Sequence, residues 1–379
     1  MRLAIVGGGP SGLFLAYLVK SRHAGSEVTV YEQNPPGATF GFGVVFSDRA
    51  LPYLEQADAQ AFAAIEAAME QWDDITIARG DEKVPIDGNG FTGIARLTLL
   101  EILEDLCRRT GVVIHHKRRI DDLDALAGSV DLMVGADGIG SGVRDHWRDA
   151  FAPSIDYLTN RFAWYGTAKP FDTLTLTFRD HDGGAYVAHH YRYQPDLSTF
   201  IVECDARTWE TSGLAALDEQ AAARLCERVF ANDLDGHPLL LNRSIWRRFP
   251  VVTNANWHHR NVVLIGDALR SVHFSIGSGT RLALEDATAL AAALDDCDLD
   301  VPRALVRFEE TRRPVVDKML AAAANSYLWY EDFGDRMHLD AWDLAWSYMT
   351  RSGRVTEARL AETAPHFVGR YKARRAASG

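Results

Sequence analysis

Three glycines near the start of the chain have the spacing of a phosphate-binding turn. Gly7, Gly9 and Gly12 fit the pattern G-x-G-x-x-G, with Pro10 and Ser11 between the last two. Gly7 would permit a tight turn, Gly9 would let the backbone approach a pyrophosphate, and Gly12 would let the helix pack closely on the strand. Amides at the start of the helix would face the phosphate charge. The spacing predicts a dinucleotide site; the alternative is a glycine-rich turn in some other α/β protein.

A carboxylate follows at the distance expected for ribose binding. Residues 3–6 and 28–31 are short apolar runs typical of parallel strands, and residues 13–19 between them have helical spacing. Glu32 ends the second run twenty residues after the last glycine, with Gln33 beside it. Strand, helix, strand and acid in this order favour dinucleotide binding, with Glu32 accepting hydrogen bonds from a ribose.

Two later segments add to the glycine motif. Asp137 and Gly138 follow one buried, strand-like run, and Asp267 ends another before the glycine-rich residues 277–279. Taken with the first motif, these segments resemble the group A flavoprotein hydroxylases, relatives of para-hydroxybenzoate hydroxylase. The three motifs span most of the chain in the order found in that family.

The resemblance implies an FAD site assembled from distant stretches. Asp137 and Gly138 would lie where FAD and NADH or NADPH approach one another, and Asp267 would bind the flavin ribitol. Arg96, just before the predicted helix 97–109, matches the family's arginine on the FAD pyrophosphate. The flavin ring would lie near a loop formed by Gly277, Ser278, Gly279 and Thr280.

Other segments resemble two groups within this family. One group hydroxylates aryl-CoA thioesters such as salicyloyl-CoA and 2-aminobenzoyl-CoA, and the other is the tryptophan hydroxylase of violacein biosynthesis. The chain resembles both groups over residues 40–48, 164–167, 198–203 and 273–280. Residues 325–331 and 350–352 look nearer to the CoA-thioester enzymes. Gly41 stands where many members have an arginine, and His273 and Phe274 replace a proline pair.

The resemblance also implies a reaction. NADH or NADPH would reduce FAD, and dioxygen would then give a flavin C4a-hydroperoxide that attacks a ring activated by an ortho hydroxyl or amino group. The protein would exclude water and orient the ring. His273 is the candidate acid–base residue, because histidine exchanges protons near neutral pH; the alternative is that it only shapes its loop. Phe42, Trp164, Tyr165 and Phe274 are expected to form an aromatic wall of the substrate pocket.

A small basic cluster surrounds Trp246. Arg243, Arg247 and Arg248 would bind the phosphates of a CoA tail through bidentate guanidinium contacts. The residues alone favour the other interpretation, a solvated edge of the protein with paired surface charges.

These residues need a two-lobed α/β framework, because 379 residues exceed the size of one hydrophobic core. We expect a Rossmann-type FAD-binding domain with an inserted antiparallel-sheet substrate domain and C-terminal helices. Residues 1–153 would form the first part of the FAD-binding domain. Residues 154–250, where aromatic and β-branched runs alternate with short turns, would form the substrate domain. Residues 251–379 would return to the first domain and end in helices, with Pro314 kinking or dividing a long one.

Composition limits the partners. A formal charge of -12 is unsuited to nucleic acid or anionic lipid. Four scattered cysteines suit reduced thiols, and no leader-like segment opens the chain, so we expect a cytoplasmic monomer or homodimer without a membrane partner. No metal site is expected, because neighbouring side chains on a strand point to opposite faces. This applies to the adjacent histidine pairs His115-His116, His189-His190 and His258-His259.

Together these features predict an FAD-dependent monooxygenase acting on a small aromatic substrate. The favoured substrate is an ortho-substituted aryl-CoA thioester, with salicyloyl-CoA converted to gentisyl-CoA. One alternative is a tryptophan or indole hydroxylase of a pigment or natural-product pathway. An alternative of another class is a non-hydroxylating flavin reductase or an FAD-binding scaffold.

Overall fold

The glycine-rich turn joins the first strand and helix of a parallel sheet. In the computed structural model, which describes residues 1–48, 51–353 and 355–378, β1 (Arg2–Val6) leads through this turn into α1 (Pro10–Arg22). The sheet has the order β16-β17-β9-β1-β2-β8, and its strands apart from the antiparallel edge strand β16 run parallel. The other strands are β2 (Glu27–Tyr31), β8 (Val113–His115), β9 (Leu132–Gly135), β16 (His258–His259) and β17 (Val262–Leu264).

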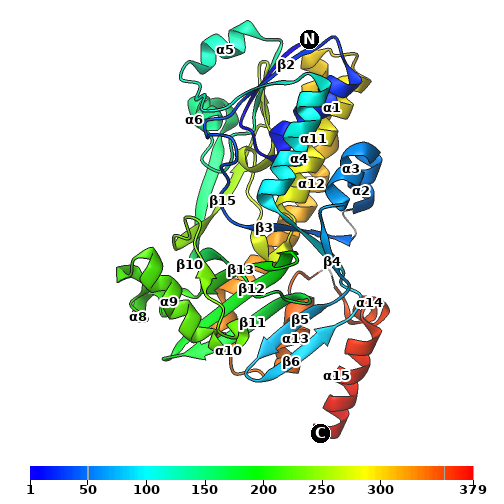
Figure 1. Cartoon of the computed structure of the whole chain (residues 1–379). Helices are drawn as coiled ribbons and strands as arrows, with labels where there is room; N and C mark the ends of the chain where they lie inside the picture. The colour runs from blue at the N-terminus through cyan, green and yellow to red at the C-terminus, as the bar shows by residue number, and fades with distance from the viewer. Residues whose placement is uncertain (49–50, 354, 379) are drawn as a thin grey trace.

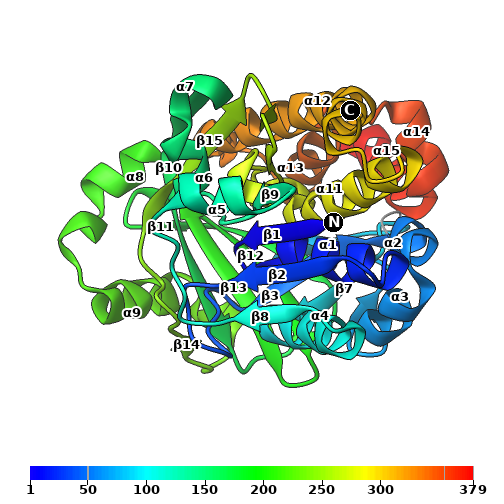
Figure 2. The same ribbon diagram turned by 90° about the horizontal axis from the view of Figure 1, so that it is seen from above.

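Helices pack against this sheet and bury its apolar strands in one core. In the views from the front and from above, α1, α4 and α11 lie together beside the sheet (Figures 1 and 2). The core joins β1, β9 and β17 to α1, α4 and the first half of α12. The helices of this lobe are α2 (Leu51–Ala57), α3 (Ala59–Glu66), α4 (Arg96–Thr110), α5 (Leu123–Ser129), α6 (Gly142–His146), α7 (Arg148–Phe151), α11 (Gly279–Asp296) and α12 (Val301–Glu331).

A second, eight-stranded sheet forms the other lobe. Four long strands, β10 (Pro153–Thr167), β11 (Leu174–His181), β12 (Gly184–Gln194) and β13 (Leu197–Cys204), pair antiparallel at its centre. The strands β14 (Leu239–Leu240) and β15 (Arg247–Asn254) pair with β10. The strands β5 (Ile75–Arg79) and β6 (Glu82–Ile86) extend the sheet beyond β11, so it also includes chain that precedes residue 153.

Each face of the second sheet is covered by different helices, because successive side chains of a strand point to opposite faces. One face packs on α9 (Glu219–Val229), next to α8 (Ala206–Thr211) and α10 (Ala231–Leu234). The other face packs on the end of α12 and on α13 (Ala341–Thr350), α14 (Glu357–Thr363) and α15 (Pro365–Ser378). A small antiparallel sheet of β3 (Gly43–Ser47), β7 (Phe91–Ala95) and β4 (Glu70–Trp72) lies between the lobes.

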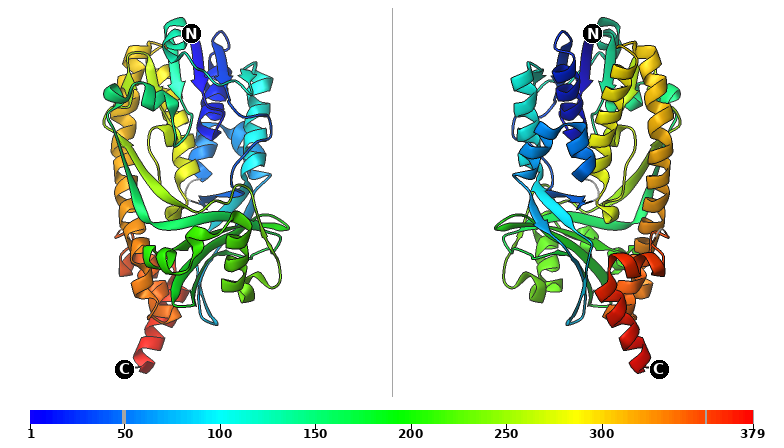
Figure 3. Two further views of the ribbon diagram at one scale, coloured as in Figure 1. Left: turned by 90° about the vertical axis from the view of Figure 1, so that its left-hand side faces the viewer. Right: turned by 90° about the vertical axis from the view of Figure 1, so that its right-hand side faces the viewer.

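One helix belongs to both lobes. The helix α12 has 31 residues and continues unbroken through Pro314, so the predicted division there is wrong. At 1.5 Å per residue it is about 46 Å long, and the side views show it running along both lobes (Figure 3). The parallel sheet, the antiparallel sheet and the C-terminal helices confirm the predicted fold class. No helix in the described ranges is long and apolar enough to cross a bilayer.

Candidate functional site

Steric contacts explain two of the three glycines of the first motif, Gly7 and Gly12. Gly7 has a positive φ of 112°, and a Cβ there would lie 2.2 Å from the carbonyl oxygen of Ala136. A Cβ at Gly12 would lie 2.2 Å from the carbonyl oxygen of Gly7, so helix and turn are in direct backbone contact. Gly9, just before α1, has no protein atom within 4 Å of the corresponding position. The turn is therefore tightly packed on the protein side and open at Gly9.

The three predicted motifs converge on this turn. The contact between Gly7 and Ala136 brings the segment that contains Asp137 against it. The segment that contains Asp267 approaches from the other side, since a Cβ at Gly266 would lie 2.6 Å from Ser11 Oγ. Stretches more than a hundred residues apart in sequence thus meet at the start of α1.

A pocket of about 130 Å³ opens beside Gly9. Its lining includes Glu32 and Arg96 from the predicted set. The Glu32 carboxylate accepts hydrogen bonds from the backbone amides of Gly8, at 2.8 Å, and Asn34, at 2.7 Å. Glu32 is therefore held at the end of β2, facing the glycine turn, whereas its neighbour Gln33 is exposed and does not line this pocket.

Asp267 interacts electrostatically with Arg96. The Asp267 side chain has solvent-exposed surface, but the surrounding protein partly desolvates its carboxyl and so raises the pKa of that group. The positive charges of Arg96 and Arg270 oppose this shift. The same environment lowers the pKa of Arg96, which the charge of Asp267 opposes. The backbone amide of Arg96 donates to the carbonyl oxygen of Phe42 at 2.8 Å. A cation and an anion thus lie together between the glycine turn and the aromatic residues described below.

A buried ionic network, not predicted from the sequence, holds the turn that carries Asp267. Asp286 of α11 is fully buried and accepts hydrogen bonds from the backbone amide of Gly266 at 3.0 Å and from Arg270 at 2.5 and 3.0 Å. Arg312 of α12 donates to Asp286 at 2.9 Å and pairs with Glu285 at 2.8 Å. In the sequence this network shows as a pair of adjacent acids within a mainly apolar stretch of α11.

The Asp137 carboxylate forms hydrogen bonds within the protein. Its carboxylate accepts hydrogen bonds from Ser141 Oγ at 2.5 Å and from the Val143 amide at 3.0 Å, at the start of α6. Burial raises the pKa of Asp137, and these hydrogen bonds oppose the shift. Gly138 has a φ of 82°, and no protein atom lies within 4 Å of the position that a Cβ would occupy, so its backbone faces open space. Asp137 fixes the turn, and Gly138 leaves room beside it.

The predicted flavin loop is held from both ends. His273 Nδ1 accepts a hydrogen bond from the Ser275 amide at 3.3 Å and so caps a short 3-10 helix, Phe274–Ile276. Burial lowers the pKa of His273 well below its usual range, as do the charges of His189 and Arg351. Gly277 adopts a φ of 57°, and α11 starts after the next residue. Ser278 Oγ donates to the carbonyl oxygen of Ile276, and Gly279 and Thr280 form the first turn of α11.

A C-terminal arginine also holds this loop. Arg351 donates to the carbonyl oxygen of Ser275 and to Ser326 Oγ, each at 2.9 Å. Ser326 Oγ is in turn 3.0 Å from Ser275 Oγ. In the sequence, the segments around residues 326 and 351 stand out only by their resemblance to CoA-thioester enzymes, which does not reveal this structural role.

One face of the second sheet forms an aromatic surface next to this loop. Trp164 packs against Gly41, where a Cβ would lie 3.2 Å from its ring, and Phe42 packs in the same way against Gly166 at 2.6 Å. Phe274 lies with its ring centroid 4.9 Å from that of Phe162. Phe42, Trp164 and Phe274 therefore lie on one side of β10, together with Phe162.

Tyr165 does not belong to this surface. It follows Trp164 on β10, so its side chain points to the opposite face, where it is fully buried in the core beneath α9. Its hydroxyl accepts a hydrogen bond from Trp246 Nε1 at 3.0 Å. The structure thus separates Tyr165 from the other predicted wall residues.

The three arginines differ in their contacts. The guanidinium of Arg247 lies 5.3 Å from the ring centroid of Phe162, at the edge of the aromatic surface, and that of Arg243 lies 4.4 Å from Phe40. Both side chains are exposed, and no carboxylate among the described residues pairs with either. Arg248 instead donates to two backbone carbonyls of β10, at 2.6 and 2.7 Å.

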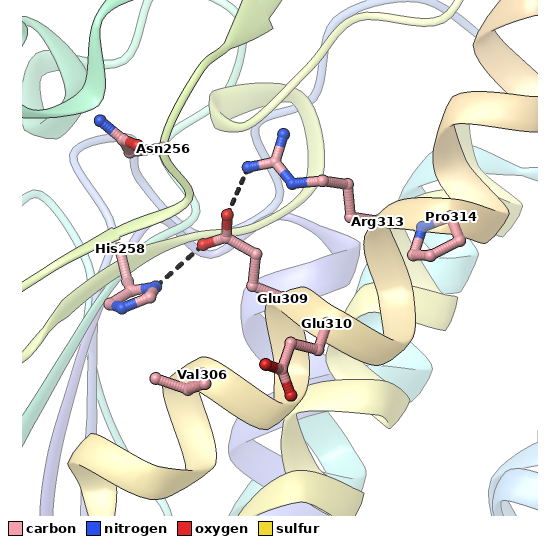
Figure 4. A pocket seen from close by; sticks show the side chains of 7 residues that line it. All are labelled: Asn256, His258, Val306, Glu309, Glu310, Arg313 and Pro314. Carbon is pink, nitrogen blue, oxygen red and sulfur yellow. Dashed lines mark hydrogen bonds and ion pairs between the residues drawn. The ribbon is translucent and has the colours of Figure 1, made fainter.

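A larger pocket lies away from all of these residues. It has a volume of about 430 Å³ and lies between α12 and the segment that leads into β16 (Figure 4). Glu309 bridges its walls by bonding His258 at 3.0 Å and Arg313. None of the predicted site residues lines it, and in the described ranges no three acidic, histidine or cysteine side chains gather as a metal site would require.

Comparisons with known proteins show which family the chain belongs to. The sequence profile of the family described as "FAD binding domain" matches residues 1–323. Salicyloyl-CoA 5-hydroxylase of Streptomyces sp is 38% identical over 98% of this chain and 73% of its own length. Protodeoxyviolaceinate monooxygenase of Chromobacterium violaceum is 34% identical, with coverage of 93% and 94%. The 3-hydroxy-4-methyl-anthranilyl-[aryl-carrier protein] 5-monooxygenase of Streptosporangium sibiricum is 35% identical, with coverage of 95% and 97%.

The fold also matches solved structures. The tetrameric form of 2-methyl-3-hydroxypyridine-5-carboxylic acid oxygenase superposes with a TM-score of 0.70 over 96% of this chain and 95% of its own. At 17% identity this likeness concerns the fold alone.

Proposed function

The chain belongs to the family with this FAD binding domain and is a flavin-dependent aromatic monooxygenase; from that premise we propose that it hydroxylates an ortho-substituted aryl-CoA thioester. The favoured reaction converts salicyloyl-CoA to gentisyl-CoA. The observation that carries the proposal is the pair of arginines, Arg243 and Arg247, which lie over aromatic rings without a carboxylate partner among the described residues.

The residues at the converged motifs fit FAD. Gly9 leaves open space at the start of a helix, where backbone amides favour a pyrophosphate. Bound FAD would accept a hydride from NADH or NADPH and activate dioxygen for transfer of one oxygen atom. We propose that Glu32 binds the ribose and that Arg96 offsets phosphate charge. The remaining contacts would come from Gly7, Pro10, Ser11, Gly12, Gln33, Asp137, Gly138, Asp267, Gly277, Ser278, Gly279 and Thr280.

The aromatic surface would orient the substrate ring and exclude water. Phe42 and Trp164 lie on the side of the second sheet that faces the 273–280 loop, and Phe274 of that loop packs against the same side through Phe162. An apolar lining of this kind favours a flat ring and keeps competing water away from the site of oxygen transfer.

His273 is proposed to act at this site mainly by shaping the loop. Its Nδ1 already accepts a hydrogen bond from Ser275, and its lowered pKa keeps the imidazole neutral near pH 7. A neutral, capped imidazole can still donate a hydrogen bond through Nε2 to a substrate oxygen.

The arginines would bind the phosphates of the CoA tail. A phosphate on a guanidinium that already lies against an aromatic ring forms a strong, charge-assisted contact. Two of the relatives, by their names, act on substrates carried by CoA or by a carrier protein. On a chain with a net charge of -12, two exposed arginines without paired acids suit an anionic substrate arm.

A substrate panel tests this proposal. Purified holoenzyme is mixed with salicylate, salicyloyl-CoA or tryptophan, and NAD(P)H oxidation, oxygen uptake and product mass are recorded. Only salicyloyl-CoA should stimulate oxidation and give a product sixteen mass units heavier. Arg243→Ala with Arg247→Ala should raise KM for salicyloyl-CoA at least roughly tenfold, which corresponds to about 1.4 kcal/mol. KM for a short salicyloyl thioester without phosphates should stay the same. Equal effects on both thioesters would contradict phosphate binding.

A second candidate is hydroxylation of a tryptophan- or indole-derived compound. The likeness to protodeoxyviolaceinate monooxygenase favours it. Activity with an indole substrate and none with any CoA thioester would replace the first proposal. NAD(P)H oxidation without linked oxygen uptake and product would instead indicate a non-hydroxylating flavin reductase.

A further inference from the structure

Polar side chains are buried beside the aromatic surface without full hydrogen bonding. His189 of β12, Glu203 of β13 and Asn160 of β10 are 7%, 2% and 4% exposed. His189 Nε2, Glu203 Oε2 and Asn160 Oδ1 have no hydrogen-bond partner among the described residues. A buried polar atom left unpaired costs roughly 1–3 kcal/mol. Two of these atoms, His189 Nε2 and Glu203 Oε2, face each other at 3.5 Å, so the carboxylate and the imidazole are in ion-pair range but do not form a hydrogen bond. A buried acid and a buried imidazole held this way indicate a function rather than a contribution to stability.

His189 faces the substrate side of the sheet. Its ring meets the Phe274 ring edge-on, with centroids 5.2 Å apart, and lies 5.0 Å from Tyr330 of α12. Tyr191, two residues along β12 and on the same face, donates its hydroxyl to the carbonyl oxygen of Gly43 at 2.8 Å. His189 is therefore between the 273–280 loop and the strand that follows Phe42.

Glu203 and Asn160 fix the position of His189. Glu203 Oε2 lies 3.5 Å from His189 Nε2, and Glu203 Oε1 accepts a hydrogen bond from Asn160 Nδ2 at 2.8 Å. Asn160 Nδ2 also donates to the carbonyl oxygen of Tyr330 at 2.7 Å. A carboxylate placed against one imidazole nitrogen sets the tautomer and stabilises the protonated ring. His273 has no such carboxylate partner in the described chain.

We propose that His189 is the acid–base residue for the ring hydroxyl of the substrate, with Glu203 and Asn160 as positioning residues. This inference rests on the proposed function. The substrate O–H bond breaks with its electron pair left on oxygen, and the proton forms an N–H bond at Nδ1 of His189. The phenolate enriches the ring in electrons before oxygen transfer. When product forms, the same proton returns to the ring oxygen and His189 is neutral again.

Ionisation of bound substrate tests the proposal without turnover. Salicyloyl-CoA is added to oxidised holoenzyme without NAD(P)H, and the phenolate absorbance is followed from pH 5.5 to 9. The groups that face His189 are Glu203, Tyr330 and His273. His189→Gln and the isosteric Glu203→Gln should each raise the phenolate midpoint by about one pH unit, a roughly tenfold shift. Each should also lower kcat/KM by roughly 10²- to 10⁴-fold, with FAD content and flavin spectrum unchanged.

The neighbouring histidine provides the matched control. His190 is also buried on β12, but it points to the other face, stacks on Phe200 and lies 2.9 Å from Thr177 Oγ1. His190→Gln should leave the phenolate midpoint unchanged. An unchanged midpoint in either FAD-loaded test variant would overturn the proposal, and so would an equal shift in the His190 control. If the wild type turns over no phenolic thioester, the proposed function fails, and the inference fails with it.

Discussion

Asp286→Asn removes the central charge of the buried network beneath Asp267. Asparagine keeps the shape of the side chain but turns one acceptor into a donor facing Arg270, which is 3% exposed. Arg312 keeps its second partner, Glu285, whereas Arg270 loses its carboxylate. Breaking a buried ion pair by removing one partner costs roughly 3–5 kcal/mol. We expect a loss in the free energy of unfolding within that range.

The matched control is an exposed pair. Asp296 and Arg307 are each about half exposed, so Asp296→Asn should cost about 0–1 kcal/mol. Urea unfolding of the apoproteins, followed by circular dichroism at pH 7, measures both variants. Because Asp286 also accepts from the Gly266 amide, its loss should weaken FAD binding at least roughly tenfold by fluorescence titration. A loss of less than about 1 kcal/mol in Asp286→Asn, no more than in the exposed control, would refute a stabilising role for the buried network.

Gly12→Ala should destabilise the apoprotein by roughly 1–3 kcal/mol in urea unfolding, because its Cβ would strike the Gly7 carbonyl. Gly9→Ala should leave the stability of the apoprotein unchanged but lower the FAD content of the purified holoprotein, because its Cβ would enter the open space beside the turn. Tyr165→Phe should cost about 1 kcal/mol, as one hydrogen bond is lost, and leave KM unchanged in steady-state assays. Burial lowers the pKa of His190 and His273, so below about pH 6.5 the unfolded chain binds more protons. The urea concentration at the unfolding midpoint should therefore decrease when the pH is lowered from 7 to 5. His273→Ala should make this decrease smaller, and it should reduce hydroxylation more than FAD content.

Local spacing was enough to predict the parallel lobe. The apolar runs around residues 3–6 and 28–31, the glycines between them and the helix at 97–109 reflect short-range geometry, and the structure has each element there. Alternation along β10 indicates that Trp164 and Tyr165 point to opposite faces, but it cannot indicate which face meets the substrate. The identity of that face depends on which side of the sheet α9 covers, and this cannot be predicted from a local sequence pattern.

Long-range pairing was beyond local patterns. The strands at residues 75–86 join a sheet whose other members start after residue 153, because β5 pairs with β11. The charges of Asp286 and Arg312 look like surface charges until α11 and α12 are packed together. Pro314 likewise predicts a break, yet α12 continues through it from the parallel lobe to the second sheet.

The length of α12 has a mechanical consequence. Its first half is fixed to the parallel lobe through Arg312, and its last residue, Glu331, accepts hydrogen bonds from the backbone of the second sheet at Thr159 and Asn160. Because the helix is attached to both lobes, the angle between the lobes cannot change without bending it. Changes in the angle between the lobes should therefore be small.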